Sequence, residues 1–241
     1  MLRASELRLL EQLPRAPAEW QPAVISSHAV GGTLALSCSD IVACGGAMHA
    51  VRDVHSLTLH VATADRLNDV SLFRAALPCM ETALTSLPAL RTFRVENASQ
   101  VGPCTRLLMP VLARLPQLAR FDLRHGAIDA ATLAPPLASL TALTALHLRY
   151  SKLGKHDAAA IATALSRLSR LASLTLAALG RDLDAHDVAA LSLGCLTALT
   201  ALDLSDNAIR ASGAVALAPA PVSYTHLEPT RLRRSRMPSS A

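Results

Sequence analysis

A spacing of leucines recurs along this chain of 241 residues and limits the folds that it can adopt. The fourth position of the pattern LxxLxLxxNxL falls, at intervals of 23, 36, 28, 25, 28 and 28 residues, on Leu34, Leu57, Phe93, Phe121, Leu146, Leu174 and Leu202. Self-similarity with a period of about 20–50 residues is the mark of a repeat architecture, in which each unit packs only on its neighbours. The spacing therefore predicts a stack of about seven units.

Each unit is expected to contain a short strand, because residues between the leucines would alternate between the two faces of a sheet. The copy that begins at Leu199 fits the pattern throughout, with Leu202, Leu204, Asn207 and Ile209 at the expected places. The position of Asn207 is occupied in the three preceding copies by Gly126, Ser151 and Leu179. The strands are therefore predicted more firmly than the turns that follow them.

A period near 28 residues leaves room for a helix between consecutive strands. Ile161, Leu165 and Leu168 recur at helical spacing, and Asp157 precedes them as a candidate N-cap. Similar stripes are Leu107, Val111 and Leu115; Leu133, Leu137 and Leu140, with Pro135 and Pro136 expected near the first turn; and Val188 with Leu191. Because helices are wider than strands, the stack should bend with its strands on the inside.

These residues resemble the ribonuclease-inhibitor-like class of leucine-rich repeats, over roughly residues 50–217. The resemblance implies an α/β horseshoe with parallel strands on the concave face and helices on the convex face. It also implies a binding protein, since the concave surface of a solenoid is its usual binding face.

The composition fits a repeat protein, because 51% of residues are apolar but only 2% are aromatic. Leucine and alanine side chains suit a core that is divided into many equivalent narrow layers, one for each repeat. The five cysteines are scattered and form no CxxC pair, which favours reduced thiols over a disulfide framework or a zinc site. With neither a signal peptide nor a membrane span expected, the sequence predicts a cytoplasmic protein.

The domain organisation is predicted in three parts. Residues 1–30 do not match the repeat and are expected to form an N-terminal cap or, alternatively, a docking segment. Residues 31–221 are expected to form about seven repeats, the last of them truncated. Residues 222–241 break the pattern, and no ordered structure is expected for them.

That last segment is similar to a translated sequencing-library adapter. The codons GTC TCT TAT ACA CAT would encode Val222–His226, and a later part of the adapter would encode Ser235–Ala241. A natural basic tail is the alternative. The segment carries four arginines and one glutamate, so residues 1–221 retain a net charge of +2 from the total of +5. The basic tail is therefore not counted toward nucleic-acid binding, and a nucleic-acid or membrane partner is not expected.

A patch on the concave face is the predicted binding site for an acidic surface of a protein partner. Its middle repeats hold more arginines than carboxylates, and arginine is favoured at interfaces because its planar fork pairs with carboxylates. The predicted contact residues are Arg91, Arg94, Glu96, Arg120, Asp122, Arg124, His147, Arg149, Thr175 and Asp203. In the alternative interpretation, Arg94 with Asp122, and Arg124 with Glu96, only neutralise each other across neighbouring strands.

Catalysis is not expected, because the chain contains no GxSxG, GxxxxGK[ST] or HExxH motif. The Gly31-Gly32 step is assigned to a turn before the first strand. His156 with Asp157, and His186 with Asp184 and Asp187, are assigned to exposed turns and not to a metal site. No cofactor is predicted.

A protein-interaction scaffold is the leading functional hypothesis. A GTPase-activating protein of the Ran GTPase-activating type is one alternative, because that family uses the same class of repeat. The sensing or substrate-binding arm of a larger receptor or ubiquitin-ligase adaptor is another. The sequence by itself does not name the partner.

Overall fold

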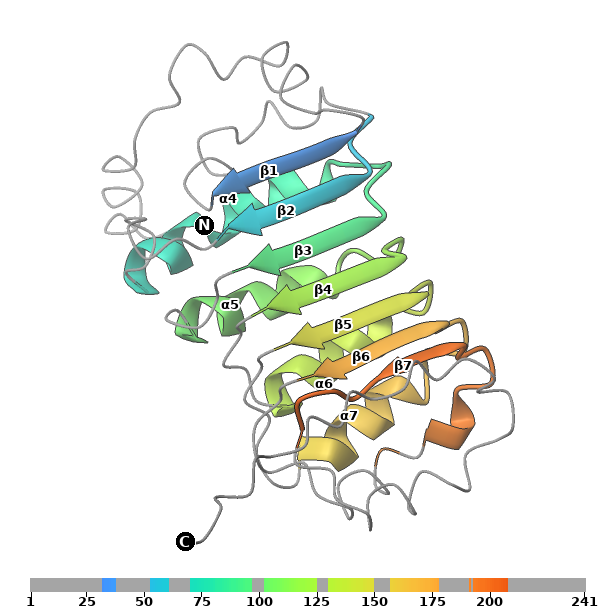
Figure 1. Ribbon diagram of the computed structural model, residues 1–241. Coiled ribbons are helices and arrows are strands. Elements are labelled where there is room, and N and C mark those ends of the chain that lie inside the picture. The colour runs from blue at the N-terminus through green and yellow to red at the C-terminus, as the bar shows by residue number, and fades with distance from the viewer. Residues whose placement is uncertain are drawn as a thin grey trace, which may run out of the picture.

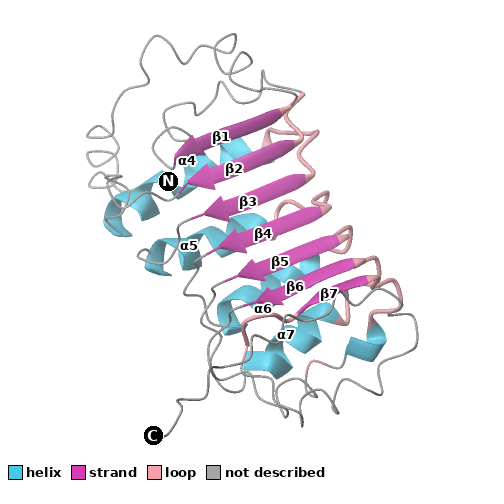
Figure 2. Ribbon diagram, viewed as in Figure 1, coloured by secondary structure: helices cyan, strands magenta, loops and turns pink. Residues whose placement is uncertain are grey.

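The computed structural model describes residues 32–37, 53–60, 70–96, 102–124, 130–149, 157–177, 191 and 193–207. In this part of the chain, seven strands stack in sequence order into one open sheet, and helices lie along one of its faces (Figure 1). All neighbouring strands run parallel. The predicted α/β solenoid is thus confirmed, with strands on the concave face and helices on the convex face (Figure 2).

The strands are short, and each contains the fourth position of one copy of the leucine pattern. They are β1 (Thr33–Ser37), β2 (Ser56–His60), β3 (Thr92–Glu96), β4 (Arg120–Arg124), β5 (Ala145–Arg149), β6 (Ser173–Ala177) and β7 (Ala201–Asp203). The register aligns the fourth pattern position across the sheet, so that Phe121 stands beside Leu146 and Leu146 beside Leu174. A slip by one residue would turn every leucine toward solvent, which is why the pattern fixes the register.

The helices fill the intervals between strands. They are α4 (Val70–Thr85), α5 (Gly102–Leu112), α6 (Ala130–Ser139) and α7 (Asp157–Leu165), and a 3-10 turn, η4, covers Leu193–Cys195. Helix α7 begins at Asp157, the residue predicted to precede it as the N-cap. The third residue of each predicted stripe lies beyond the end of its helix and is nevertheless buried, as Leu168 illustrates.

A tight turn follows each of these helices and leads into the next strand. In it, the backbone N–H of one leucine donates to the carbonyl of the leucine three residues earlier. Leu118 bonds to Leu115 in this way at 3.0 Å, and Leu143 to Leu140 at 2.9 Å. Both leucines of each turn are buried, so the turn carries side chains into the core while it reverses the chain.

The core is a continuous column of apolar side chains between the sheet and the helices. Leu146 and Leu148 of β5 are fully buried, as are Ile161 and Leu165 of α7. Burying one leucine side chain stabilises the fold by roughly 1.5–3 kcal/mol, and every repeat contributes several. Two of the chain's three phenylalanines extend the column in β3 and β4, where the rings of Phe93 and Phe121 stack with centroids 6.2 Å apart.

The prolines lie deeper in the helices than the sequence indicated. Pro135 and Pro136 were expected near the first turn, but α6 begins at Ala130, which places both prolines in its middle. Proline lacks a backbone N–H and is costly in a helix interior. The helix forms nevertheless, because Leu133 and Leu137 are fully buried in the core on either side of the proline pair.

Gly32 occupies the turn predicted before the first strand. Its φ of 75° lies in the left-handed region, which glycine adopts without strain. A Cβ at this position would overlap the ring of His55, and the Gly32 carbonyl accepts hydrogen bonds from the backbone N–H groups of His55 and Ser56. The turn thus joins β1 to the segment that starts β2.

Asn207 shows what the consensus asparagine does. Its side-chain amide donates to the carbonyls of Leu204, at 2.9 Å, and Leu176, at 2.5 Å. One side chain therefore satisfies backbone acceptors in two successive repeats. The equivalent residues Gly126, Ser151 and Leu179 lie outside the described residues, as do residues 1–30, the helix predicted at Val188 and all residues after Asn207.

Candidate functional site

The concave face is formed by the first, third and fifth residues of each strand, because the second and fourth are buried beneath the sheet. The register arranges these residues in three rows. The first row is Thr33, Ser56, Thr92, Arg120, Ala145, Ser173 and Ala201; the middle row is Ala35, Thr58, Arg94, Asp122, His147, Thr175 and Asp203; and the last is Ser37, His60, Glu96, Arg124, Arg149 and Ala177.

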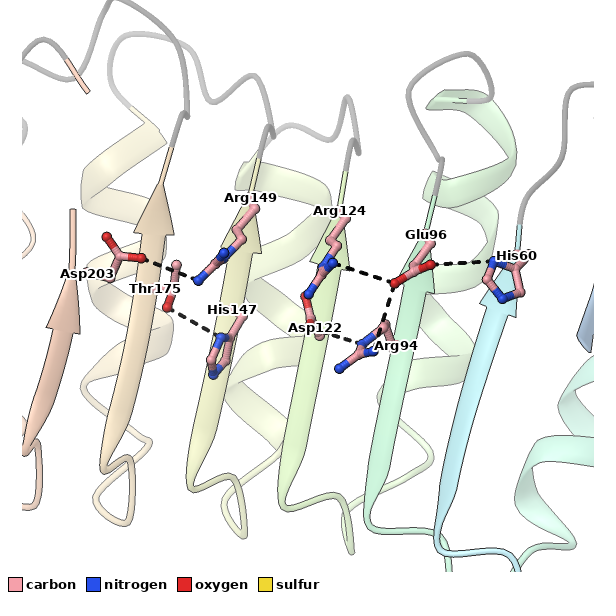
Figure 3. Close-up of polar contacts among 9 residues, drawn as sticks. All are labelled: His60, Arg94, Glu96, Asp122, Arg124, His147, Arg149, Thr175 and Asp203. Carbon is pink, nitrogen blue, oxygen red and sulfur yellow. Dashed lines mark hydrogen bonds and ion pairs between the residues drawn. The ribbon is translucent and has the colours of Figure 1, made fainter. Parts of the chain in front are cut away.

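Five charged or titratable side chains from β2, β3 and β4 make contact on this face, and we call them the concave cluster: His60, Arg94, Glu96, Asp122 and Arg124 (Figure 3). Glu96 lies at its centre. Its carboxylate is 3.5 Å from His60 Nδ1, 3.8 Å from Arg124 Nη1 and 3.9 Å from Arg94 Nη1. The cluster thus links three strands through one carboxylate.

Asp122 is the most buried member of the concave cluster, with 1% of its side chain exposed. Arg94 Nε donates to its Oδ2 at 3.1 Å. Arg124 Nε lies 3.4 Å from its Oδ1, but the two atoms are not oriented as a hydrogen bond, so both remain without a hydrogen-bond partner. The two guanidinium groups offset the cost of burying this carboxylate.

A second ion pair spans a whole strand. Arg149 Nη2 of β5 lies 3.4 Å from Asp203 Oδ2 of β7, so the arginine reaches across β6 (Figure 3). The β6 residues beside these two side chains are Thr175 and Ala177, which are 3% and 6% exposed. Small residues at these positions leave the space that the long arginine side chain needs.

His147 lies in the middle row between the concave cluster and that ion pair. Its Nδ1 is 3.3 Å from the hydroxyl of Thr175, and its Nε2 is buried without a hydrogen-bond partner in the described part of the chain. Burial lowers the pKa of His147 from its ordinary value of 6.5, and the charge of Arg120 lowers it further. The imidazole is therefore neutral at pH 7.

Arg120 differs from the other three strand arginines. Each of Arg94, Arg124 and Arg149 lies within 4 Å of a carboxylate, whereas the described residues supply none to Arg120. Its Nε is buried and has no hydrogen-bond partner there, a property that it shares with the Nε atoms of Arg124 and Arg149. Arg120 is the neighbour of Ala145 in the sheet, and the alanine side chain is a single methyl group.

The structure brings together most of the predicted contact residues but separates Arg91 from them. Arg91 precedes β3, is exposed, and donates from Nη1 to the carbonyls of Pro88 and Leu90. The pairs Arg94–Asp122 and Arg124–Glu96, expected if the charges neutralise each other, both form. His60 is not among the predicted contact residues, although its position beside Glu96 in the register could have indicated a role.

A metal centre is not formed by the described residues, which contain no group of three or more His, Cys, Asp or Glu side chains able to hold an ion. The histidines considered for such a role, His156 and His186, lie outside them. None of the described helices is both long and apolar enough to cross a membrane.

Comparison with known proteins identifies the repeat. Residues 196–218 match the family model described as "Leucine Rich repeat". A search of curated proteins finds no significant match.

Several solved structures are similar to the chain at low identity. They include the TLR13–ssRNA13 complex, at 17% identity and a TM-score of 0.43, covering 74% of this chain and 26% of that one. Internalin C2 of Listeria monocytogenes is 15% identical, with a TM-score of 0.30, covering 86% of this chain and 81% of that one. Internalin F of the same organism is 17% identical, with a TM-score of 0.29, covering 76% and 68%. The chain spans about a quarter of the length of the TLR13 chain.

Proposed function

We propose that this protein is an interaction scaffold that binds a protein partner on the concave face of its sheet. The observation that carries the proposal is the concave cluster, in which charged side chains from three strands hold one another in place (Figure 3). Side chains that are already ordered lose less conformational entropy when a partner binds. The described helices lie on the opposite face and leave this one open.

The surface that best complements this face is an acidic surface of a protein. The three rows contain four arginines against the carboxylates of Glu96, Asp122 and Asp203. Those carboxylates are interleaved with the arginines and would repel a continuous line of phosphates. A folded protein can instead place single acidic side chains between them, so we favour a protein partner over a nucleic acid.

We propose further that the protein binds its partner without catalysing a reaction, and that it is located in the cytoplasm. The sequence contains no motif for nucleophilic or metal-dependent hydrolysis. Cys79 is partly exposed and Cys195 is exposed, and both are free thiols, the form that a reducing compartment maintains.

Charge reversal on the concave face tests the proposal. We expect the variant with Arg94, Arg124 and Arg149 all changed to Glu to lose the proteins that the wild-type chain captures from lysate of its own cells. Quantitative mass spectrometry of the captured proteins measures the loss, and binding of the purified partner then confirms it. Circular dichroism and thermal melting verify that the variant is folded.

The matched control changes three exposed arginines outside the concave face, Arg74 in α4 and Arg167 and Arg170 beyond α7, to Glu. It alters the net charge equally and should capture the same proteins as the wild type. Retention of those proteins by the folded concave variant, or their loss from the control, would rule out the concave face as the binding site.

A further inference from the structure

We propose that Arg120, His147 and Ser173 form a subsite for a single carboxylate, an Asp or Glu side chain of the protein partner. The inference rests on the proposed function and specifies where on the concave face an acidic group is recognised. The three residues come from the neighbouring strands β4, β5 and β6, and the small Ala145 lies between Arg120 and Ser173 in the register.

The first observation behind this subsite is an arginine without a counter-charge. The carboxylates of Glu96, Asp122 and Asp203 lie against other arginines. The Nε of Arg120 is buried and lacks an acceptor among the described residues. A buried donor without an acceptor costs free energy, and more so when it is charged, so an incoming carboxylate would remove this penalty as well as form an ion pair.

The second observation is a neutral donor next to that arginine. The hydroxyl of Thr175 lies 3.3 Å from His147 Nδ1; when the hydroxyl donates to Nδ1, the proton of the neutral imidazole is on Nε2. This Nε2 is buried and has no acceptor among the described residues. In the register, His147 lies on β5 beside Asp122, two residues beyond the Ala145 that pairs with Arg120, and its pKa is lowered by burial and, next, by the charge of Arg120.

The third observation is the shape of the surface. In the first row, Arg120 is followed on β5, β6 and β7 by Ala145, Ser173 and Ala201. Small residues at this row on the three strands beyond Arg120 leave room for a side chain from outside. Ser173 lies in the same row, one strand beyond Ala145, and its hydroxyl can supply a third donor.

Binding at this subsite should be linked to the protonation of His147. The groups that act on its titration are Arg120, Asp122 and Arg124 on β4 and Arg149 on β5, with Asp122 alone raising the pKa. The concave positions of β6 are Ser173, Thr175 and Ala177, which do not titrate near neutral pH. A bound carboxylate would oppose the three arginines and raise the pKa of His147.

A carboxylate placed in the subsite by mutation tests the inference without a partner. In Ala145→Glu the new side chain lies beside Arg120, and we expect the pKa of His147, followed by NMR of its imidazole, to rise above the wild-type value. Ala145→Gln has the same size without the charge, and Ala201→Glu has the charge two strands away. Both controls should leave the pKa of His147 near the wild-type value.

Three results of that titration would overturn the subsite. They are a wild-type pKa in Ala145→Glu, an equal rise in Ala145→Gln, and an imidazole proton on Nδ1 in the wild-type protein. The nitrogen chemical shifts of His147 report the tautomer directly. Because the added side chain is tethered, the outcome does not depend on finding the natural partner.

A capped hexaglutamate peptide tests binding from solution, with capped hexaglutamine as its uncharged control. We expect saturable shifts of the His147 resonances with hexaglutamate alone. Arg120→Met should weaken this binding about tenfold or more, the loss expected for one charged hydrogen-bonded pair, whereas Arg167→Met should leave it unchanged. Binding should strengthen between pH 7.5 and pH 5.5, where glutamate stays ionised and His147 takes up a proton.

The same titration separates this inference from the proposed function. If hexaglutamate shifts resonances of the concave strands equally in wild type and Arg120→Met, the concave face binds acidic peptides but the subsite is wrong. If the shifts fall only on helices and turns, the concave face itself is wrong. Shifts at His147 that vanish in Ala145→Glu, where the subsite is already filled, would support both.

Discussion

At the scale of single residues, the concave face depends on how each buried charge is compensated. Asp122 is almost completely buried and lies against two arginines, Arg94 and Arg124, whereas Asp203 is 37% exposed and lies against one arginine, Arg149. Both carboxylates belong to the same row of the sheet. Burial therefore determines which of them the fold depends on, because water screens an exposed ion pair but not a buried one.

Asp122→Asn should lower the free energy of unfolding by about 1.5–3 kcal/mol, the range for a hydrogen bond to a charged group. The change leaves two guanidinium groups facing a neutral amide. Asp203→Asn is the matched control and should cost less than about 1 kcal/mol, as exposed pairs do. Urea denaturation measures both variants, and equal losses would show that the burial of Asp122 has no energetic role.

His147 makes the stability of the fold depend on pH. Its pKa is lower in the folded chain than the ordinary 6.5, so the unfolded chain binds a proton more readily. The stabilisation is complete above pH 6.5 and is lost as the pH falls below it. Between pH 7.5 and pH 5.5 the wild type should lose more unfolding free energy than His147→Asn, which has no such group. An equal loss in the two proteins would contradict this assignment.

At the scale of elements, proline has opposite effects in the helices and in the turns. Pro135 lies in the middle of α6, where the missing N–H costs a hydrogen bond, and its side chain is exposed. Pro116 is the second residue of the turn closed by the Leu118–Leu115 hydrogen bond, where its fixed φ suits the backbone. The same residue type therefore weakens one element and stiffens the other.

Pro135→Ala should stabilise the protein by up to about 3 kcal/mol, the cost of proline in a helix interior. Pro116→Ala should destabilise it by about 0.4–1 kcal/mol, because alanine leaves the unfolded chain more conformational freedom. Both side chains are exposed, so neither change opens a cavity in the core. Thermal and urea unfolding show whether each variant has gained or lost unfolding free energy. A destabilised Pro135→Ala would show that the proline pair is needed for the packing of α6.

At the scale of the whole molecule, each strand of the described sheet pairs only with its neighbours in sequence. Stability in such a stack is approximately a sum of repeat terms and nearest-neighbour interfaces. Strands β4 and β5 have partners on both sides, whereas β1 and β7 have one each among the described strands. The centre of the stack, which also contains Arg120 and His147, should therefore be its most rigid part.

Native-state hydrogen exchange should show this gradient. We expect the amides of Leu123 and Leu148 to exchange slowest and those of Leu36 and Leu202 fastest, since edge strands open without breaking two interfaces. All four leucines are buried, so exposure alone does not predict the order. Uniform protection across the sheet would indicate that the solenoid unfolds as a single cooperative unit.

The leucine spacing by itself determined the strand order, the parallel register and the membership of the middle row, because a side-chain period of two permits only one register that buries every leucine. It also indicated the pairs Arg94–Asp122 and Arg124–Glu96, which are neighbours in that register. The start of α7 was predicted as well, whereas the depth of Pro135 in α6 was not, since packing overrides the local preference of proline.

Only the tertiary structure determined which charged or polar groups the long side chains contact. An arginine can reach several carboxylates, and sequence position does not select among them. Arg149 reaches past small β6 residues to Asp203, and Arg91 turns back onto its own backbone. These contacts leave Arg120 without a counter-charge among the described residues, one strand away from a half-buried and neutral His147. Periodicity fixes where a backbone lies, whereas the distances between side-chain ends depend on how the neighbouring strands are packed.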